Sequence, residues 1–332
     1  MRGEALSERS SKILDMLRDS GDFVSGQDIS RCLGISRSAV WKHVGRLRKR
    51  GYVIDAVPNK GYRLAEEVDL PVSDEIKRFL RTESLGCEIV FMNQVDSTNR
   101  LAQMLAAQGA AHGTVVTADS QTMGRGRRGR DWISPPGCSL YMSTILRPGV
   151  YPAAASQIPI LSVLASVRGV ERMAPPMDLR VKWPNDIYCN GRKLSGTLCE
   201  MKAEMDRVEY VVVGTGINVN VLPVQGGLPI SATSILAETG TSVSRAGLAA
   251  SVLEEFELLY SSWLSRQDLS RIMPLWKKYS MLLGRRVSVS TSGDRIFGMS
   301  MGISPDGALN LEMEDGSIRP VYAGDATLDS LE

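Results

Sequence analysis

One ten-residue run combines glycine and arginine at an unusual density. Residues 121–130 read Gln-Thr-Met-Gly-Arg-Gly-Arg-Arg-Gly-Arg, and Trp132 follows soon after. Glycine lets a backbone approach a ligand closely, and guanidinium groups hold phosphates and carboxylates with paired hydrogen bonds. The run therefore predicts a mobile loop that binds an anion such as phosphate. Taken alone, it is equally typical of a charged segment that contacts RNA.

Two common nucleotide-binding patterns do not account for this loop. The phosphate-binding pattern G-x-x-x-x-G-K-[ST] occurs nowhere in the chain. Gly214-Thr215-Gly216 lacks the third glycine of a dinucleotide-binding fingerprint. If the glycine–arginine run holds a nucleotide, the loop must do so with its own backbone and guanidinium groups.

A second segment places a carboxylate and an ammonium group on one hairpin. Asn190-Gly191 lies between apolar runs, which predicts a two-residue turn. Residue 189 then pairs with 192, residue 188 with 193, and residue 186 with 195. Asp186 and Lys193 would share a face as diagonal neighbours, about 7–8 Å apart. For an isolated Asp and Lys, the simpler interpretation is an ion pair on a surface hairpin.

The first sixty residues predict the element that binds DNA. Residues 7–64 read as three helices followed by a hairpin, which is a winged helix-turn-helix. In this motif the third helix enters the major groove and nearby basic residues contact phosphates. The candidate DNA-binding residues are Ser36, Arg37, Ser38, Trp41, Lys42 and, at the tip of the wing, Lys60. The alternatives are a small helical domain with a solvated basic face, or a winged helix that contacts protein.

The distribution of charge supports the DNA interpretation. The 332-residue chain has a formal net charge of only +2. Residues 1–63 nevertheless hold 13 Lys and Arg against 7 Asp and Glu, whereas the remainder holds 26 against 30. The basic excess therefore lies in the winged helix, where contact with nucleic acid needs it.

Cysteine, histidine and hydropathy exclude several classes of protein. The five cysteines form no C-x-x-C pair, so neither a disulfide framework nor a zinc site is indicated, and a reducing cytoplasm is expected. With two histidines, a mechanism that needs several is excluded. The first ten residues carry two glutamates and no apolar core of the kind that a signal peptide has, so none is expected. The longest uncharged stretch, 148–167, contains three prolines. We expect a loop and a buried helix there, and no membrane span.

The remaining pattern divides the chain into three predicted domains. A linker at 66–71 is followed by mixed helical and β signals, with an amphipathic helix over 248–263. From residue 283 onward, short β runs alternate with glycine turns, which predicts a small all-β barrel. The expected domains are 1–66, 67–280 and 281–332.

Several of these segments together carry a resemblance to one family. Asp96-Ser97-Thr98-Asn99, the 121–130 loop, Lys182–Asp186, Gly191–Gly196 and Gly214–Asn220 occur in the order and spacing of biotin–protein ligases. With the winged helix, the chain resembles the bifunctional bacterial type that also represses the biotin operon. The resemblance covers nearly the whole sequence. It implies an α+β fold: a winged helix, a central mixed-sheet catalytic domain with helices on one side, and a C-terminal SH3-like β-barrel.

The resemblance also implies roles for individual residues. Lys193, Arg127 and Asp186 would be catalytic: Lys193 contacts the biotin carboxylate and the α-phosphate, and Asp186 receives or orients a proton. The implied nucleotide-binding residues are Arg125, Arg127, Trp132 and Asn218. Trp132 would stack against adenine, because Ile133 stands where some relatives have an aromatic residue. The implied biotin-binding residues are Ser97, Thr98, Asn99, Gln121, Arg125, Gly126, Arg127, Lys193 and Gly196.

The implied activity is the ATP-dependent formation of biotinyl-5'-AMP and transfer of biotin to a lysine of a biotin carboxyl carrier protein. Mg²⁺ is expected with ATP, without assigned ligands, and a liganded homodimer is expected on operator DNA, with the adenylate as corepressor. One departure is Thr327-Leu328-Asp329, where members often carry a basic residue near the nucleotide. The alternatives are a non-catalytic biotin-sensing transcription factor and a lipoate or octanoate transferase.

Overall fold

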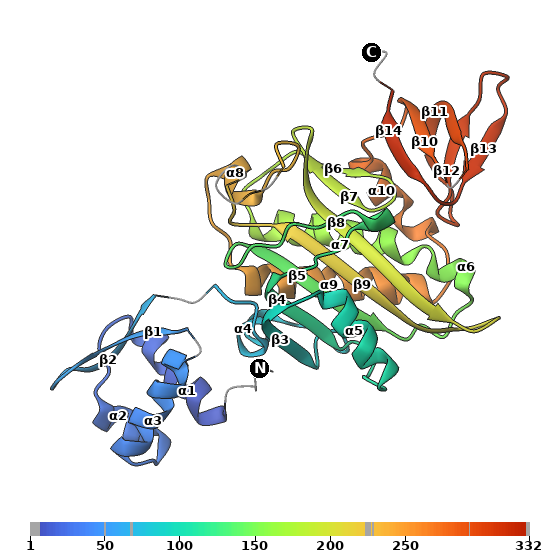
Figure 1. Ribbon diagram of the computed structural model, residues 1–332. Helices are drawn as coiled ribbons and strands as arrows, with labels where there is room; N and C mark the ends of the chain where they lie inside the picture. Colours follow the sequence, from blue (N-terminus) through green and yellow to red (C-terminus); the bar gives the residue numbers. More distant parts are fainter. Residues whose placement is uncertain are drawn as a thin grey trace. The chain divides into compact units, whose positions relative to one another are not determined.

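The protein forms two compact units in a computed structural model (Figure 1). The units are Gly3–Leu70 and Pro71–Glu332. The structure describes residues 7–49, 51–66, 69–222, 227, 229–291 and 293–329. Each unit is considered by itself.

The first unit is the predicted winged helix-turn-helix. Its elements are α1 Glu8–Ser20, α2 Gly26–Leu33, α3 Arg37–Lys49, β1 Val53–Val57 and β2 Gly61–Glu66. Ser7 and Ser25 cap the first two helices through their hydroxyl oxygens, and Gly34 ends α2 at a φ of 61°. Ile13, Val40 and other apolar residues of the three helices pack into one small core.

A seven-stranded mixed sheet is the centre of the second unit (Figure 1). In spatial order its strands are β3 Ile89–Val95, β4 Val115–Gln121, β5 Ser139–Leu146, β9 Val208–Asn218, β8 Arg192–Ala203, β7 Asp186–Cys189 and β6 Leu179–Lys182. Strands β3 and β4 are parallel, and every other neighbouring pair is antiparallel.

Helices cover both faces of this sheet, although unequally. The helices are α4 Ser73–Phe79, α5 Thr98–Ala107, α6 Pro152–Ala155, α7 Ile158–Met173, α8 Ile235–Thr239, α9 Arg245–Leu264 and α10 Met273–Tyr279, with 3₁₀ turns η1 Arg127–Gly129 and η2 Ser270–Ile272. Val211 and Val213 of β9 belong to the core that contains α7 and α9. Val212, which points to the other face, packs with Ala102 and Ala106 of α5. The expectation of helices on one side is therefore wrong for α5.

The longest apolar segment lies inside the second unit. Pro152–Met173 is the one helical stretch of the described chain long and apolar enough to cross a membrane, and 72% of its 18-residue window is buried. This burial is that of a core helix, in agreement with the predicted loop and buried helix. The helix predicted over 248–263 is α9, but it is a core helix and not an amphipathic one, because residues 245–253 are all buried.

The C-terminal strands form a five-stranded antiparallel sheet. They are β10 Arg286–Ser290, β11 Arg295–Ile303, β12 Leu309–Glu312, β13 Ile318–Val321 and β14 Asp325–Leu328, in the spatial order β13-β12-β11-β10-β14. This SH3-like sheet does not close into a barrel within the described strands. Its apolar residues, including Val287 and Leu311, belong to the same hydrophobic cluster as α7 and α9.

The β7–β8 hairpin differs from prediction by one residue of register. Pairs 189–192 and 188–193 form as expected, but a bulge then pairs residue 187 with 195 and Asp186 with Gly196. A bulge adds one residue to one strand and changes which face the following side chains occupy. Lys193 and Gly196, which regular alternation would put on opposite faces, therefore share the face of Asp186.

Candidate active site

A cavity of 510 Å³ lies beside α5, on the same face of the central sheet that α5 packs against. Its volume is in the range of small-molecule sites. The structure brings all twelve predicted catalytic, biotin-binding and nucleotide-binding residues to its lining. These are Ser97, Thr98, Asn99, Gln121, Arg125, Gly126, Arg127, Trp132, Asp186, Lys193, Gly196 and Asn218.

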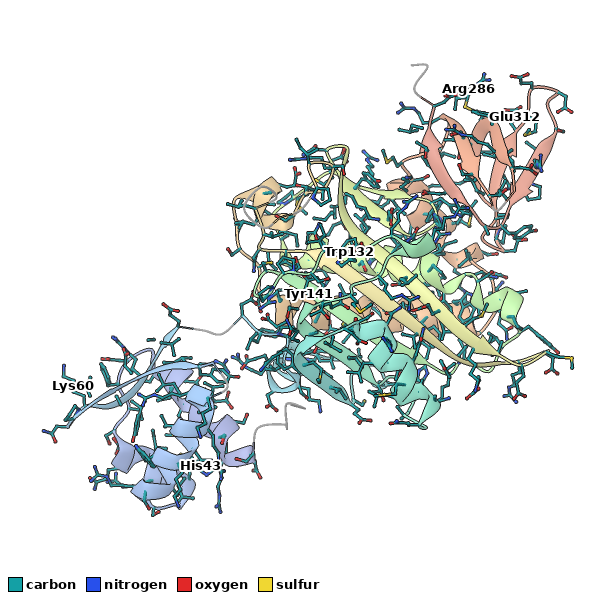
Figure 2. The ribbon with its side chains drawn as sticks, viewed as in Figure 1. His43, Lys60, Trp132, Tyr141, Arg286 and Glu312 are labelled. Atoms are coloured by element: carbon teal, nitrogen blue, oxygen red, sulfur yellow. The ribbon has the colours of Figure 1, made fainter. Side chains whose placement is uncertain are left out.

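Two glycines of β9 make the floor of this cavity low enough for other side chains to lie on it. A Cβ atom on Gly214 would lie 2.0 Å from Asn99 Oδ1, and one on Gly216 would lie 2.7 Å from the Trp132 ring. A larger side chain at either position would force Asn99 or Trp132 to move. Figure 2 labels Trp132 in the region of the central sheet. The Gly-Thr-Gly run therefore provides close approach on a strand and is not part of a dinucleotide fold.

One end of the cavity is lined by a connected set of hydrogen bonds. Gln121 Oε1 accepts from the backbone N–H of Thr98, 2.9 Å away, and from its hydroxyl. Ser143 Oγ donates to Asn99 Oδ1 over 2.6 Å. Ser97 is the N-cap residue of α5, but its buried hydroxyl accepts no hydrogen bond from the N–H groups of the helix. The amides of Asn99 and Gln121 are thus fixed by protein contacts.

The other end carries the predicted ion pair at short range. Lys193 Nζ lies 2.7 Å from Asp186 Oδ2 and 5.6 Å from the centroid of the Trp132 ring. The expected 7–8 Å is the backbone spacing of diagonal neighbours, which a lysine side chain can span to reach the carboxylate. A cation placed between a carboxylate and an aromatic face is well positioned to meet an anionic ligand.

Three polar atoms of the cavity lining are buried without a partner among the described residues. They are Asp186 Oδ1, Trp132 Nε1 and Asn218 Oδ1. Buried polar atoms in folded proteins are nearly always hydrogen-bonded, so these three indicate where a ligand supplies the missing partners. Asn218 Nδ2 donates to the Thr233 carbonyl over 2.9 Å. That bond identifies the unpartnered atom as an acceptor, which requires a donor on the ligand.

The arginines of the loop contact the protein in this structure. Arg125 lies 3.3 Å from Glu200 Oε1. Arg127 donates to Asn185 Oδ1 over 2.9 Å and to the Gly324 carbonyl over 3.1 Å. Arg128 donates to the Ser290 carbonyl, and Arg130 pairs with Asp325. Of these four arginines, Arg125 and Arg127 are the two that were predicted to bind a ligand. The contacts of Arg127, Arg128 and Arg130 join the loop to the C-terminal sheet.

Lys182 and Asp325 are among the charged residues of the cavity lining to which sequence reasoning assigned no role. Lys182 Nζ lies 3.5 Å from Asp325 Oδ1, and both side chains line the cavity. Burial alone would raise the pKa of Asp325, but Lys182 and Arg130 together lower it below its ordinary value. Lys182 directly precedes the Trp-Pro-Asn-Asp segment, which was a usable signal. Asp325 comes from the other end of the chain, and no sequence pattern pointed to it.

The predicted DNA-binding residues lie on the surface of the first unit. Residues 36, 37, 38, 41, 42 and 60 are all exposed, and Trp41 retains 66% of its accessible surface. Lys60 stands in the turn between β1 and β2, at the end of the hairpin marked in Figure 2. His43 points the other way: its Nδ1 lies 2.8 Å from the Ser10 hydroxyl in the core.

Three stretches of the chain match families of known proteins. Residues 91–218 match the biotin/lipoate A/B protein ligase family. Residues 9–63 match an HTH domain, and residues 282–328 match the biotin protein ligase C-terminal domain.

Similarity to individual proteins extends over nearly the full length. The bifunctional ligase/repressor BirA of Bacillus subtilis is 39% identical over 319 residues, which cover 95% of this chain and 97% of the relative. Its counterpart from Escherichia coli is 33% identical, with 97% of each chain covered. A solved structure, biotin protein ligase from Aquifex aeolicus in complex with biotin and ATP, is 28% identical with a TM-score of 0.61, over 73% of this chain and 99% of that one.

Proposed function

Because this chain belongs to the biotin protein ligase family and carries the helix-turn-helix domain of its bifunctional ligase/repressor members, we propose that Lys193, Arg127 and Asp186 carry its chemistry. The reaction has two steps. The biotin carboxylate attacks the α-phosphorus of ATP and pyrophosphate leaves. The ε-amine of a carrier lysine then attacks the biotinyl carbonyl, forming an amide and releasing AMP.

The first step needs positive charge where two anions meet. Lys193 brings an ammonium group to the cavity lining, and its pairing with Asp186 holds it in place before ligands arrive. Fixed charges in a site that excludes water stabilise developing negative charge more strongly than water does. Lys193 therefore contacts both the biotin carboxylate and the α-phosphate. Arg127 contacts the oxygens of the departing pyrophosphate.

The unpartnered atoms are the observation that carries this assignment. Asn218 Oδ1 is a buried acceptor without a donor. The exocyclic amine of adenine is such a donor, so Asn218 reads the base while Trp132 offers an aromatic surface beside it. Biotin occupies the opposite end, where Ser97, Thr98, Asn99 and Gln121 meet its ureido ring. The backbones of Gly126 and Gly196 allow close approach.

Asp186 serves the second step. A lysine that attacks a carbonyl must first lose its proton, and a positioned carboxylate can accept or orient it. Asp186 Oδ1 is buried and has no partner in the described chain, whereas Oδ2 holds Lys193. The incoming carrier lysine therefore donates to Oδ1.

Mg²⁺ accompanies ATP in this proposal. No group of three or more His, Cys, Asp or Glu that could hold a metal occurs among the described residues. Mg²⁺ is commonly bound by substrate phosphates, water and only one or two carboxylates, so the site does not need a dedicated cage. When bound, the ion adds positive charge beside the phosphates.

We divide the work among domains 1–66, 67–280 and 281–332. The first binds operator DNA through Ser36, Arg37, Ser38, Trp41, Lys42 and Lys60. A two-fold operator requires two such domains, so a homodimer promoted by biotinyl-5'-AMP is the DNA-binding form. The chain works in the cytoplasm, where a biotin carboxyl carrier protein is its protein substrate.

Mass spectrometry of a biotin carboxyl carrier domain incubated with the chain, biotin and ATP tests the catalytic proposal. We expect one biotinyl group on one carrier lysine, and none when lipoate replaces biotin. In Asp186→Asn, transfer should fall about 10²–10⁴-fold, the usual contribution of a general base. Equal transfer by wild type and variant would remove Asp186 from the mechanism, and lipoylation would favour a lipoate transferase.

The DNA proposal is tested by selecting duplexes from a random-sequence pool and measuring their binding by anisotropy. We expect binding to strengthen when biotin and ATP are both present and to weaken as salt rises. Sedimentation under the same conditions should show a dimer. Salt-sensitive binding that ignores biotin and ATP would contradict the corepressor role.

A further inference from the structure

One carboxylate of β8 touches both walls of the cavity. Glu200 Oε2 accepts a hydrogen bond from Asn99 Nδ2 at 3.0 Å. Its other oxygen, Oε1, lies 3.3 Å from Arg125 Nη1. Asn99 belongs to the first turn of α5, and Arg125 belongs to the glycine–arginine loop. Glu200 thus joins the biotin end of the cavity to the loop that borders the nucleotide end.

Asn99 has little freedom on its other sides. It is buried, its Oδ1 accepts from Ser143, and a Cβ on Gly214 would nearly overlap that oxygen. Its amide nitrogen donates to the Leu198 carbonyl over 3.1 Å as well as to Glu200. A ligand acceptor that takes a proton from this nitrogen must therefore compete with Leu198 or Glu200.

Arg125 is less firmly held than Asn99. Its side chain is 52% exposed, whereas that of Glu200 is 23% exposed. An ion pair of this kind contributes little as long as water and Asn99 also satisfy the carboxylate. If a ligand withdraws Asn99 from Glu200, the half-buried carboxylate must be satisfied by Arg125 instead.

Backbone contacts within the loop connect Arg125 to Trp132. Arg125 pairs with Asp131 in a β-bridge, the Gly126 N–H donates to the Arg130 carbonyl, and the Trp132 N–H donates to the Gly124 carbonyl. Residues 124–132 are therefore a small closed hairpin. Trp132 lies on Gly216 and beside Lys193, where the nucleotide is proposed to bind.

We propose that Glu200 is a positioning residue that couples occupancy of the biotin end to closure of the 124–132 loop over the nucleotide end. The inference rests on the proposed biotin site. A ligand acceptor at Asn99 releases Glu200 from the amide, Glu200 draws Arg125 inward, and the hairpin brings Trp132 with it. Because coupling between two sites is reciprocal, a closed loop tightens biotin binding by the same factor.

Trypsin reports the position of this loop directly, because residues 125, 127, 128 and 130 are all arginines. The full-length chain is digested with and without biotin, and cleavage within 124–132 is followed by mass spectrometry. In the wild type, biotin should slow this cleavage. In Glu200→Gln, which keeps the side-chain shape but removes the charge, the protection by biotin should fall about 5-fold or more, the lower end of ordinary coupling.

Calorimetry of biotin binding provides the readout that a merely structural role would not give. The dissociation constant of Glu200→Gln should rise by the factor by which protection falls. Arg125→Met should have the same effect, and the double variant should add nothing, since the two residues act as one pair. Glu209→Gln is the matched control, because Glu209 forms an exposed ion pair with Lys202 on the same strand pair.

Each outcome has a defined meaning. Biotin protection that is lost in Glu200→Gln and Arg125→Met but kept in Glu209→Gln supports the coupling. Equal protection of wild type and Glu200→Gln overturns it and leaves the ligase function standing, as does a wild type that binds biotin without any protection. A wild type that does not bind biotin contradicts the proposed function itself.

Discussion

Arg127 is held at both ends of its guanidinium group, by Asn185 and by the Gly324 carbonyl. Burial lowers the pKa of this guanidinium, and the nearby carboxylates of Asp186 and Asp325 act in the opposite direction. The residue therefore joins the loop to the central sheet and to the C-terminal sheet at the same time. Removing it should free the loop at the cavity where we propose that the adenylate is held.

Arg127→Gly is accordingly expected to release biotinyl-5'-AMP. Ordering of the loop excludes water from a hydrolysable intermediate, so a loosened loop retains it poorly. Free adenylate should accumulate in the solution and label lysines of bystander proteins. Chromatography of released adenylate and blotting of an added bystander protein measure both effects. Unchanged release and labelling would remove Arg127 from the role of retaining the intermediate.

The residues of the site were largely predictable because their motifs follow one another in the chain in family order. All twelve predicted residues line one cavity. The contacts among them were not predictable. Asp325 meets Lys182 across more than a hundred residues of sequence, and the pairing of Glu200 with Arg125 depends on how β8 and the loop are placed. Such contacts arise from tertiary packing and leave no local pattern.

At the scale of elements, the β7–β8 hairpin shows where local pattern fails. Asn190-Gly191 correctly predicted the turn and the first two residue pairs. The bulge that follows could not be predicted, because Leu194 and Ser195 are both buried and alternation therefore gives no signal there. That one extra residue places Gly196, in place of Ser195, opposite Asp186 on the face that Asp186 already shares with Lys193. The register error thus falls at the proposed catalytic residue.

Helix α3 contains a glycine that packing within its unit does not require. A Cβ on Gly45 would meet no atom within 4 Å, and the position has an ordinary helical φ. Alanine is favoured over glycine in a helix interior by about 0.8–1 kcal/mol. Gly45→Ala should therefore stabilise α3, seen as slower hydrogen exchange of its amides in the full-length chain.

Gly34→Ala is the matched control. Its Cβ would also meet nothing within 4 Å, but Gly34 ends α2 at a φ of +61°, which alanine rarely adopts. Gly45→Ala should therefore slow amide exchange in α3, whereas Gly34→Ala should speed amide exchange in α2. Faster or unchanged exchange in Gly45→Ala would mean that the open space beside α3 is occupied in solution.

At the scale of the whole molecule, the order of the parts was predictable and their integration was not. A basic winged helix, a central mixed sheet and a C-terminal β region follow from charge, periodicity and turn spacing. The described structure nevertheless places the central and C-terminal strands around one hydrophobic cluster, and the loop arginines reach the C-terminal sheet. Separation of 67–280 from 281–332 therefore remains a prediction about domains and is not visible as two cores.

Each compact unit contains one of the two histidines, which gives a probe of both. Burial lowers the pKa of His43, and the positive charges of Arg46 and Arg9 lower it further. Burial also lowers the pKa of His112, whose Nδ1 accepts from the backbone N–H of Arg147 over 3.0 Å. Both should titrate below 6.5 in proton NMR of the folded chain, with His43→Gln assigning the signals.

The sign of the effect on stability follows from these lowered values. Below pH 6.5 the unfolded chain takes up protons before the folded chain does, so the free energy of unfolding falls as pH drops toward the folded-state pKa values. Above pH 6.5 this contribution is constant. A folded-state midpoint at or above 6.5 for either histidine would contradict the burial of that residue.

Biotin-dependent exchange of labelled pyrophosphate into ATP tests the central claim most directly, because it isolates adenylation from transfer and from DNA binding. We predict exchange with biotin, none with lipoate, and loss of exchange in Lys193→Ala. Lys202→Ala should retain it, because Lys202 is an exposed lysine of the same strand that pairs with Glu209. Exchange that persists in a folded Lys193→Ala, or no exchange by the wild type, would contradict the account of this cavity as an adenylation site built around Lys193.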